Sequence, residues 1–149
     1  GGNATNNSTD NFFFDKVKNK YVFDQNKLSE NHKKNQDAVE SSMKEGVEWV
    51  IVSNTLLSQW EREPYEKLAI KYGYSIHIAH PKTFSTESNP IYKNGVFDAD
   101  LVKFRRTKED ETGKIIPENV MDYMCDKFTQ EKVDTSPLDN SIFEWIANL

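Results

Sequence analysis

The polar triplet Ser53-Asn54-Thr55 interrupts the most apolar run of the chain at a point where ligands often bind. The run before it, Val47 to Ser53, is rich in branched and aromatic residues and predicts a strand buried on both faces of a parallel sheet. Ligands of parallel α/β sheets gather beyond the carboxyl ends of the strands. In nucleotide-binding folds, such a strand end usually supplies an aspartate that holds Mg²⁺. Here the position offers the amide of Asn54.

Few other residues are candidates for chemistry, and each also has a structural interpretation. Asp10 and Asn11 precede three phenylalanines and are typical of a turn cap. Arg105 and Arg106 are a basic pair that is as often a solvated surface as a binding site. Cys125, the only cysteine, lies on the apolar side of a predicted helix and is expected in the core. The pattern of His77 and His80 places them on opposite sides of one strand, so we expect no metal site there.

Composition restricts the partners of the chain. Its 149 residues suit one domain of mixed layers, and the formal net charge of −5 argues against a broadly basic nucleic-acid surface. Nucleic acid would have to bind locally, at the basic segment 103–108. A single cysteine allows no internal disulfide and favours an intracellular location. The sequence contains no apolar run of the roughly 20 residues that a membrane-spanning helix needs.

The elements that must position these residues alternate between helix and strand. Asp24 is a plausible N-cap for a helix that runs to about Glu45 and ends at Gly46. Its periodic positions predict an outer helix with one packed side, formed by Leu28, His32, Gln36, Val39 and Met43. After the strand at 47–53, Ser58 and Glu61 have the spacing of a capping box.

That second helix is expected to end at Gly73. A strand over Tyr74 to His80 would then complete a βαβ unit. We expect Trp60 to pack against the start of the second helix.

The rest of the chain predicts a surface loop and helices. Residues 82–96 are polar and predict the loop, a short helix follows over Phe97 to Arg106, and Pro117 opens another helix through Phe128. Pro137 opens a last helix, whose aromatic residues Phe143 and Trp145 predict docking on a protein partner. We therefore expect an α/β domain over residues 1–128, with a lid segment at about 97–116, and a docking tail over 129–149.

Five motifs in this order resemble the P-loop kinase-like domains related to phage polynucleotide kinase. They are STDNFFF at 8–14, YVFD at 21–24, Asn54-Thr55, WExxPY at 60–65 and YGY at 72–74, with a basic helix at 101–106. Similar segments occur in the kinase-like domain of ubiquitin-ligase-binding proteins. The resemblance covers about Ser8 to Phe128. It implies a mainly parallel sheet covered by helices.

The resemblance also implies roles for single residues. Asp10 matches the carboxylate that activates the accepting hydroxyl as a general base. Arg105, with Arg106, falls in the lid segment whose arginine steadies the transferring phosphoryl group, although the register differs by about one residue. Asn54 and Thr55 match the cofactor-binding strand end, but Asn54 stands where the family often has aspartate.

The largest departure from the family is that no Gly-x-x-x-x-Gly-Lys-Ser/Thr motif occurs among the six glycines. Without that loop the phosphates of ATP have no cradle. Either a stretch of about 30 residues, the scale of a βα unit, precedes Gly1 in the native protein, or the domain has lost catalysis. The polar residues at Asn3, Asn6 and Asn7 slightly favour the second.

Two functions therefore stay open. The first is a degenerate, non-catalytic kinase-like domain that serves as a structural or interaction subunit of a larger assembly, with no cofactor. The second is the C-terminal portion of an active polynucleotide or small-metabolite kinase, which would use Mg-ATP.

Overall fold

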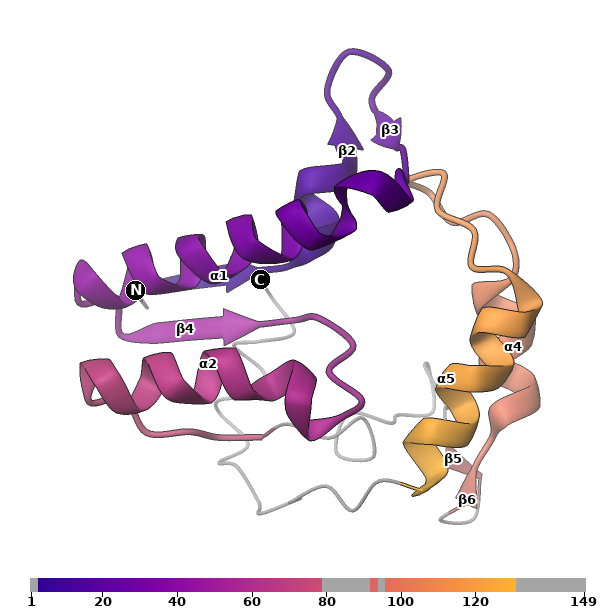
Figure 1. Cartoon of the computed structure of the whole chain (residues 1–149). Helices are drawn as coiled ribbons and strands as arrows, with labels where there is room; N and C mark the ends of the chain where they lie inside the picture. The colour runs from indigo at the N-terminus through magenta and orange to yellow at the C-terminus, as the bar shows by residue number, and fades with distance from the viewer. Residues whose placement is uncertain (1–2, 79–91, 94–95, 131–149) are drawn as a thin grey trace. The chain divides into compact units, whose positions relative to one another are not determined.

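The computed structural model describes residues 3–78, 92–93 and 96–130, which fall into two compact units (Figure 1). The first unit comprises Gly1–Ile76 together with Glu111–Lys114. The second unit comprises His77–Asp110 and Ile115–Leu149.

The centre of the first unit is a short parallel sheet. Strand β1 (Ala4–Asn7) pairs in parallel with β4 (Trp49–Val52), and helix α1 (Leu28–Lys44) lies between them in the chain. Parallel strands need such a crossover, because a tight turn can join only antiparallel ones. The chain is therefore mixed α/β, and β4 confirms the strand predicted within 47–53. Its side chains are half-buried rather than buried on both faces, since the described sheet has two strands.

Helix α1 begins and ends near the predicted residues, but it packs through a different face. Asp24 accepts a hydrogen bond from the Asn26 amide at 3.0 Å and caps a short 3₁₀ helix, η2 (Gln25–Lys27), that leads into α1. His32, expected on the packed side, is exposed. The buried positions of α1 are Asn31, Asn35, Val39, Ser42 and Met43. Two of these are asparagines, and periodicity of apolar residues cannot identify a buried amide.

Helix α2 (Gln59–Tyr72) confirms the predicted capping box and its end at Gly73. The Ser58 amide donates to Glu61 Oε2 at 2.7 Å, and Gly73 has a φ of 74°, which glycine adopts at little cost. Trp60 is 73% exposed, so its predicted packing is wrong. Five residues of helix turn through about 500°, which points Trp60 well away from the buried Tyr65.

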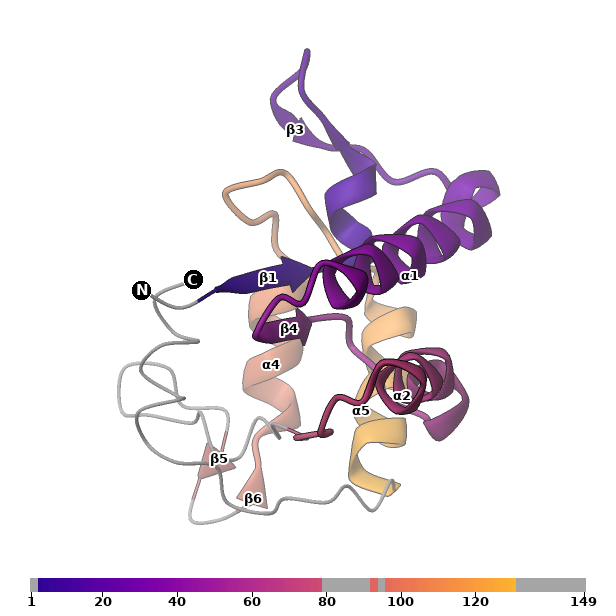
Figure 2. The same cartoon turned by 90° about the vertical axis from the view of Figure 1, so that its left-hand side faces the viewer.

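Helices α1 and α2 build the core of the first unit. Figure 2 shows both helices on the same side of β1 and β4. The apolar core between them consists of Val39, Met43, Tyr65 and Ala69, with Val39 completely buried. The core therefore fixes the helix starts, and the strand ends beside them, relative to one another.

The strand predicted at Tyr74 to His80 does not form in residues 74–78, and its last two residues lie outside the described part of the chain. The Tyr74 amide donates to the Ala69 carbonyl at 2.8 Å, and its hydroxyl donates to the Val47 carbonyl at 2.5 Å. These bonds fold Tyr74 back onto the end of α2. The parallel crossover of the first unit is therefore β1-α1-β4 rather than the βαβ unit predicted from 47 to 80.

A small hairpin follows β1. A 3₁₀ helix, η1 (Thr9–Phe13), leads into β2 (Phe14–Asp15), which pairs antiparallel with β3 (Lys20–Tyr21). The aromatic cluster is covered only in part, because Phe13 is 5% exposed whereas Phe12 and Phe14 are 40% and 38% exposed. Figure 1 shows the hairpin projecting near the start of α1.

The second unit contains a two-stranded antiparallel pair, β5 (Tyr92–Lys93) with β6 (Val96–Phe97), followed by α4 (Ala99–Arg106) and α5 (Glu118–Gln130). Both helices confirm the predicted ones. Lys103 Nζ lies 2.8 Å from Asp122 Oδ1 and links the two helices. Cys125 is 4% exposed, which confirms its core position, and burial raises the pKa of its thiol.

Two predicted segments lie wholly or mostly outside the described part of the chain. Most of the predicted loop, and the predicted tail helix with Phe143 and Trp145, lie outside the described residues. Within the described part, none of the helices has the length and apolarity required to cross a membrane.

Candidate functional site

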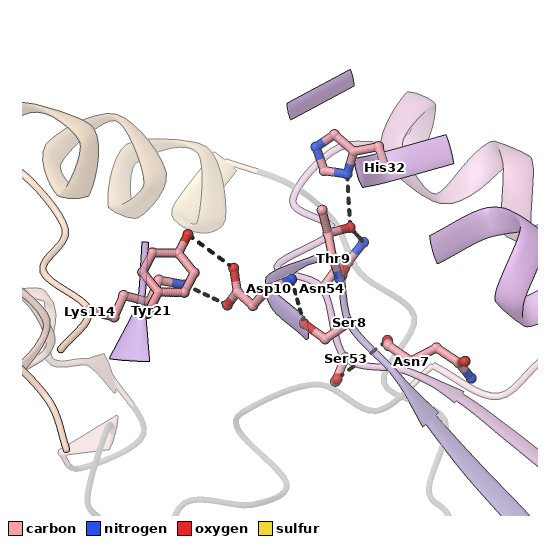
Figure 3. A network of polar contacts seen from close by, with 9 residues as sticks. All are labelled: Asn7, Ser8, Thr9, Asp10, Tyr21, His32, Ser53, Asn54 and Lys114. Carbon is pink, nitrogen blue, oxygen red and sulfur yellow. Dashed lines mark hydrogen bonds and ion pairs between the residues drawn. The ribbon is translucent and has the colours of Figure 1, made fainter. Parts of the chain in front are cut away.

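Asn54, directly beyond β4, uses its whole side-chain amide to join the ends of the two parallel strands. Asn54 Oδ1 accepts a hydrogen bond from the Thr9 amide at 2.8 Å (Figure 3). Its Nδ2 donates to Thr9 Oγ1 at 3.0 Å and to the Tyr65 hydroxyl at 3.2 Å. An asparagine has one carbonyl and two N–H groups, so each of them has a protein partner.

A buried polar layer supports Asn54 from the helix side. The Tyr65 hydroxyl also accepts a hydrogen bond from Asn35 Nδ2 at 2.9 Å, and Asn35 is 1% exposed. His32 Nδ1 lies 3.0 Å from Thr9 Oγ1, the hydroxyl that also accepts a hydrogen bond from Asn54 Nδ2. Because an unpaired buried polar group is costly, this network specifies one arrangement of strand ends and helices.

The strand ends are joined a second time next to Asn54. The Ser53 amide donates to the Asn7 carbonyl at 3.0 Å, and Ser53 Oγ donates to Asn6 Oδ1 at 2.8 Å. Asn7 is 7% exposed, and its Nδ2 donates to the Ile51 carbonyl at 3.1 Å. Asn7 is thus tolerated as the buried residue of β1 because its side-chain amide is hydrogen-bonded, whereas Asn6 is exposed.

Asp10 lies in η1, one residue after Thr9, and its carboxylate has two neighbouring donors. Lys114 Nζ is 2.6 Å from Asp10 Oδ2, and the Tyr21 hydroxyl donates to Asp10 Oδ1 at 3.4 Å (Figure 3). The side chains of Lys114 and Asp10 are 27% and 49% exposed. Ion pairs with this much exposure contribute about 0.2–1 kcal/mol. The carboxylate is therefore accessible and only weakly held.

Tyr21 is the group of this cluster whose acidity is perturbed. Burial raises the pKa of its phenol to about 12, and the charge of Asp10 and the hydrogen bond to it act in the same direction. Tyr21 is consequently protonated throughout the physiological range and remains a hydrogen-bond donor to Asp10.

The structure places the sequence-derived candidates in two groups. Asp10 and Asn54 belong to the first unit and are connected through Thr9, whereas Thr55 beside them is exposed. Arg105 and Arg106 are exposed in the last turn of α4, in the second unit.

Sequence reasoning missed Lys114 and Tyr21 as partners of Asp10, and Asn35 and Tyr65 as partners of Asn54. Asp10 and Lys114 are 104 positions apart, and no local pattern connects them. Tyr65 was visible only as the last residue of the WExxPY motif.

The described part of the chain contains no group of three or more His, Cys, Asp or Glu side chains placed to hold a metal ion. Asp10 therefore has a lysine and a tyrosine as its nearest polar partners, rather than other carboxylates.

Comparison with known proteins finds several similar proteins, and one of them matches about half of the chain. Over 77 residues, or 52% of this chain, it is 32% identical to NEDD4-binding protein 2 of Homo sapiens. The chain spans 4% of the length of that protein. No family model matches the chain, and no solved structure matches it. The chain is thus similar to a short part of a much longer human protein.

Proposed function

We propose that this chain belongs to a P-loop kinase-like domain, related to polynucleotide kinases, that serves as a structural or interaction subunit rather than as a catalyst. The five motifs that resemble this family, at 8–14, 21–24, 54–55, 60–65 and 72–74, support the kinase-like assignment. The similarity to a short part of NEDD4-binding protein 2, which its name describes as a binding protein, supports the interaction role.

The state of Asn54 is the observation that carries the non-catalytic role. A strand-end residue that helps to hold Mg-ATP needs an oxygen directed toward the ligand, and a charged one binds Mg²⁺ best. Asn54 is uncharged, and its only oxygen accepts the Thr9 amide at 2.8 Å. Its two N–H groups are used by the hydroxyls of Thr9 and Tyr65. The polar groups of the Asn54 side chain are thus used to connect parts of the domain.

A second candidate is an active ATP-dependent kinase of which this chain is a part. It is favoured by Asp10, whose carboxylate is half exposed and accepts hydrogen bonds at both oxygens. A general base needs an accessible carboxylate within hydrogen-bond reach of the substrate hydroxyl. In this role Asp10 would accept the proton, Arg105 and Arg106 would stabilise the phosphoryl group, and Mg-ATP would be the cofactor.

The partners differ between the two candidates. The interaction role requires no cofactor and assigns protein binding to the tail residues Phe143 and Trp145. The kinase role requires a hydroxyl-bearing acceptor. An intracellular location, proposed from the single cysteine, suits both roles.

One experiment on the full native protein separates the candidates. We would measure Mg-ATP binding by calorimetry and phosphoryl transfer to a 5′-hydroxyl oligonucleotide and to a panel of small hydroxyl metabolites. The interaction role predicts neither binding nor transfer. Transfer that Asp10→Asn abolishes, while the matched control Asp37→Asn on the solvent side of α1 retains it, would establish the kinase and overturn the interaction role.

A further inference from the structure

The segment Glu111–Lys114 is a distant part of the chain that lies on the first unit. The Tyr21 amide donates to the Thr112 carbonyl at 2.8 Å, and Lys114 Nζ lies 2.6 Å from Asp10 Oδ2. Gly113 between these attachment points has a φ of 84°, which glycine adopts with little strain. We call residues 111–114 the strap.

The strap places a cation against the carboxylate of Asp10, which stays 49% exposed. Lys114 approaches Oδ2, and the Tyr21 hydroxyl approaches Oδ1. The ammonium group of Lys114 also lies 5.1 Å from the centre of the Tyr21 ring, which adds a cation–π attraction. A substrate hydroxyl or a ligand ammonium group that approaches Oδ2 therefore competes with Lys114 for the same oxygen.

The contact is suited to opening because its electrostatic part is exposed to solvent. Exposed ion pairs contribute little net free energy, and salt screens them. Gly113 also gives the backbone freedom to turn away between the two attachment points. The amide of Val22, the next residue after Tyr21, donates a hydrogen bond to the Phe13 carbonyl at 2.8 Å. This bond does not involve the strap. The hairpin can therefore keep its own hydrogen bond when the strap leaves.

From these contacts we infer that the strap is an autoinhibitory element: Lys114 competes with ligands for Asp10 in the closed state, and release of the strap removes this competitor. The movement itself does not depend on the proposed function. The effect of the movement on ligand binding rests on the proposed function, in which Asp10 contacts the ligand.

Amide hydrogen exchange followed by NMR on this chain tests the movement without any ligand. In Lys114→Met, we expect exchange of the Tyr21 amide to accelerate about two- to fivefold, the range that loss of an exposed ion pair allows. Exchange of the Val22 amide should stay unchanged. The control Lys16→Met, at an exposed lysine of the hairpin turn, should alter neither amide.

Chemical labelling of carboxylates tests whether Lys114 shields Asp10 from other reagents. Carbodiimide-driven amidation of Asp10 should be faster in Lys114→Met than in the wild type, and faster in the wild type at high salt than at low salt. Any one of three results would overturn the proposed strap movement. They are unchanged exchange of the Tyr21 amide, equal acceleration of exchange at the Tyr21 and Val22 amides, and unchanged labelling of Asp10. None of these readouts involves ATP, so failure of the strap is distinguishable from failure of the proposed function.

Discussion

Asn54 and Thr9 form a reciprocal pair in which the Thr9 amide donates to Asn54 Oδ1 at 2.8 Å and Asn54 Nδ2 donates to Thr9 Oγ1 at 3.0 Å. The pair joins the end of β4 to the residues that follow β1, 45 positions away in sequence. Because Thr9 is 5% exposed, its amide has little access to water as a substitute partner. Together with the bonds from Ser53, this side chain holds the strand ends in place beside Asp10.

Replacing Asn54 should destabilise the first unit. Asn54→Ala leaves the buried Thr9 amide without its partner, which costs about 1–3 kcal/mol in the free energy of unfolding. Urea denaturation monitored by tryptophan fluorescence would measure it. The control Asn6→Ala removes the exposed hydrogen bond from Ser53 Oγ and should change stability by less than about 0.5 kcal/mol. Equal losses in the two variants would contradict the special role of Asn54.

The Tyr65 hydroxyl should also contribute to the free energy of unfolding of the first unit. Tyr65→Phe keeps the ring but leaves Nδ2 of the fully buried Asn35 without an acceptor, at a cost of about 1–3 kcal/mol. Thermal unfolding of the variant gives the loss. Tyr72→Phe is a matched control, since the Tyr72 hydroxyl bonds to Glu40 at a solvent-accessible place, and its effect should be smaller. A larger effect at Tyr72 would refute the importance of the buried layer.

Val39 should be the most sensitive apolar position among the residues named in the α1–α2 core. It is completely buried between the two helices, and Val39→Ala should cost about 2–3 kcal/mol through lost burial and the cavity left behind. Val17, which is 96% exposed in the hairpin turn, provides the control: Val17→Ala should leave the urea midpoint unchanged. A small effect of Val39→Ala would show that the core collapses around the missing methyl groups.

Tyr21 should make stability fall at high pH. Its pKa is raised from the ordinary 10.0 to about 12, so the unfolded chain loses this proton first as the pH rises. The contribution is complete below pH 10 and is lost as the pH approaches about 12.

Asp10→Asn should lower the pKa of Tyr21, yet leave it above 10.0 because burial is the main cause. NMR titration of the labelled tyrosine ring measures this change. An unchanged pKa in Asp10→Asn would contradict the contact between the two side chains.

Local chemistry was sufficient to predict most helices. The capping pair Ser58 and Glu61, the stop at Gly73 and the proline before α5 act within one or two helical turns, so the sequence predicts them directly. The strand expected at Tyr74 to His80 does not form in its described part, where the Tyr74 amide bonds to the Ala69 carbonyl at the end of α2.

The sequence by itself determined the α/β class, the parallel strand that precedes Asn54, and Asp10 and Asn54 as candidate residues. Only the tertiary structure decided what those residues contact. Asn54 meets Thr9 and Tyr65, and Asp10 meets Lys114, across long sequence separations. Such pairs form because burial of the α1–α2 core brings strand ends and helix starts together, and the polar groups carried with them must then find partners. Neither periodicity nor capping contains that information.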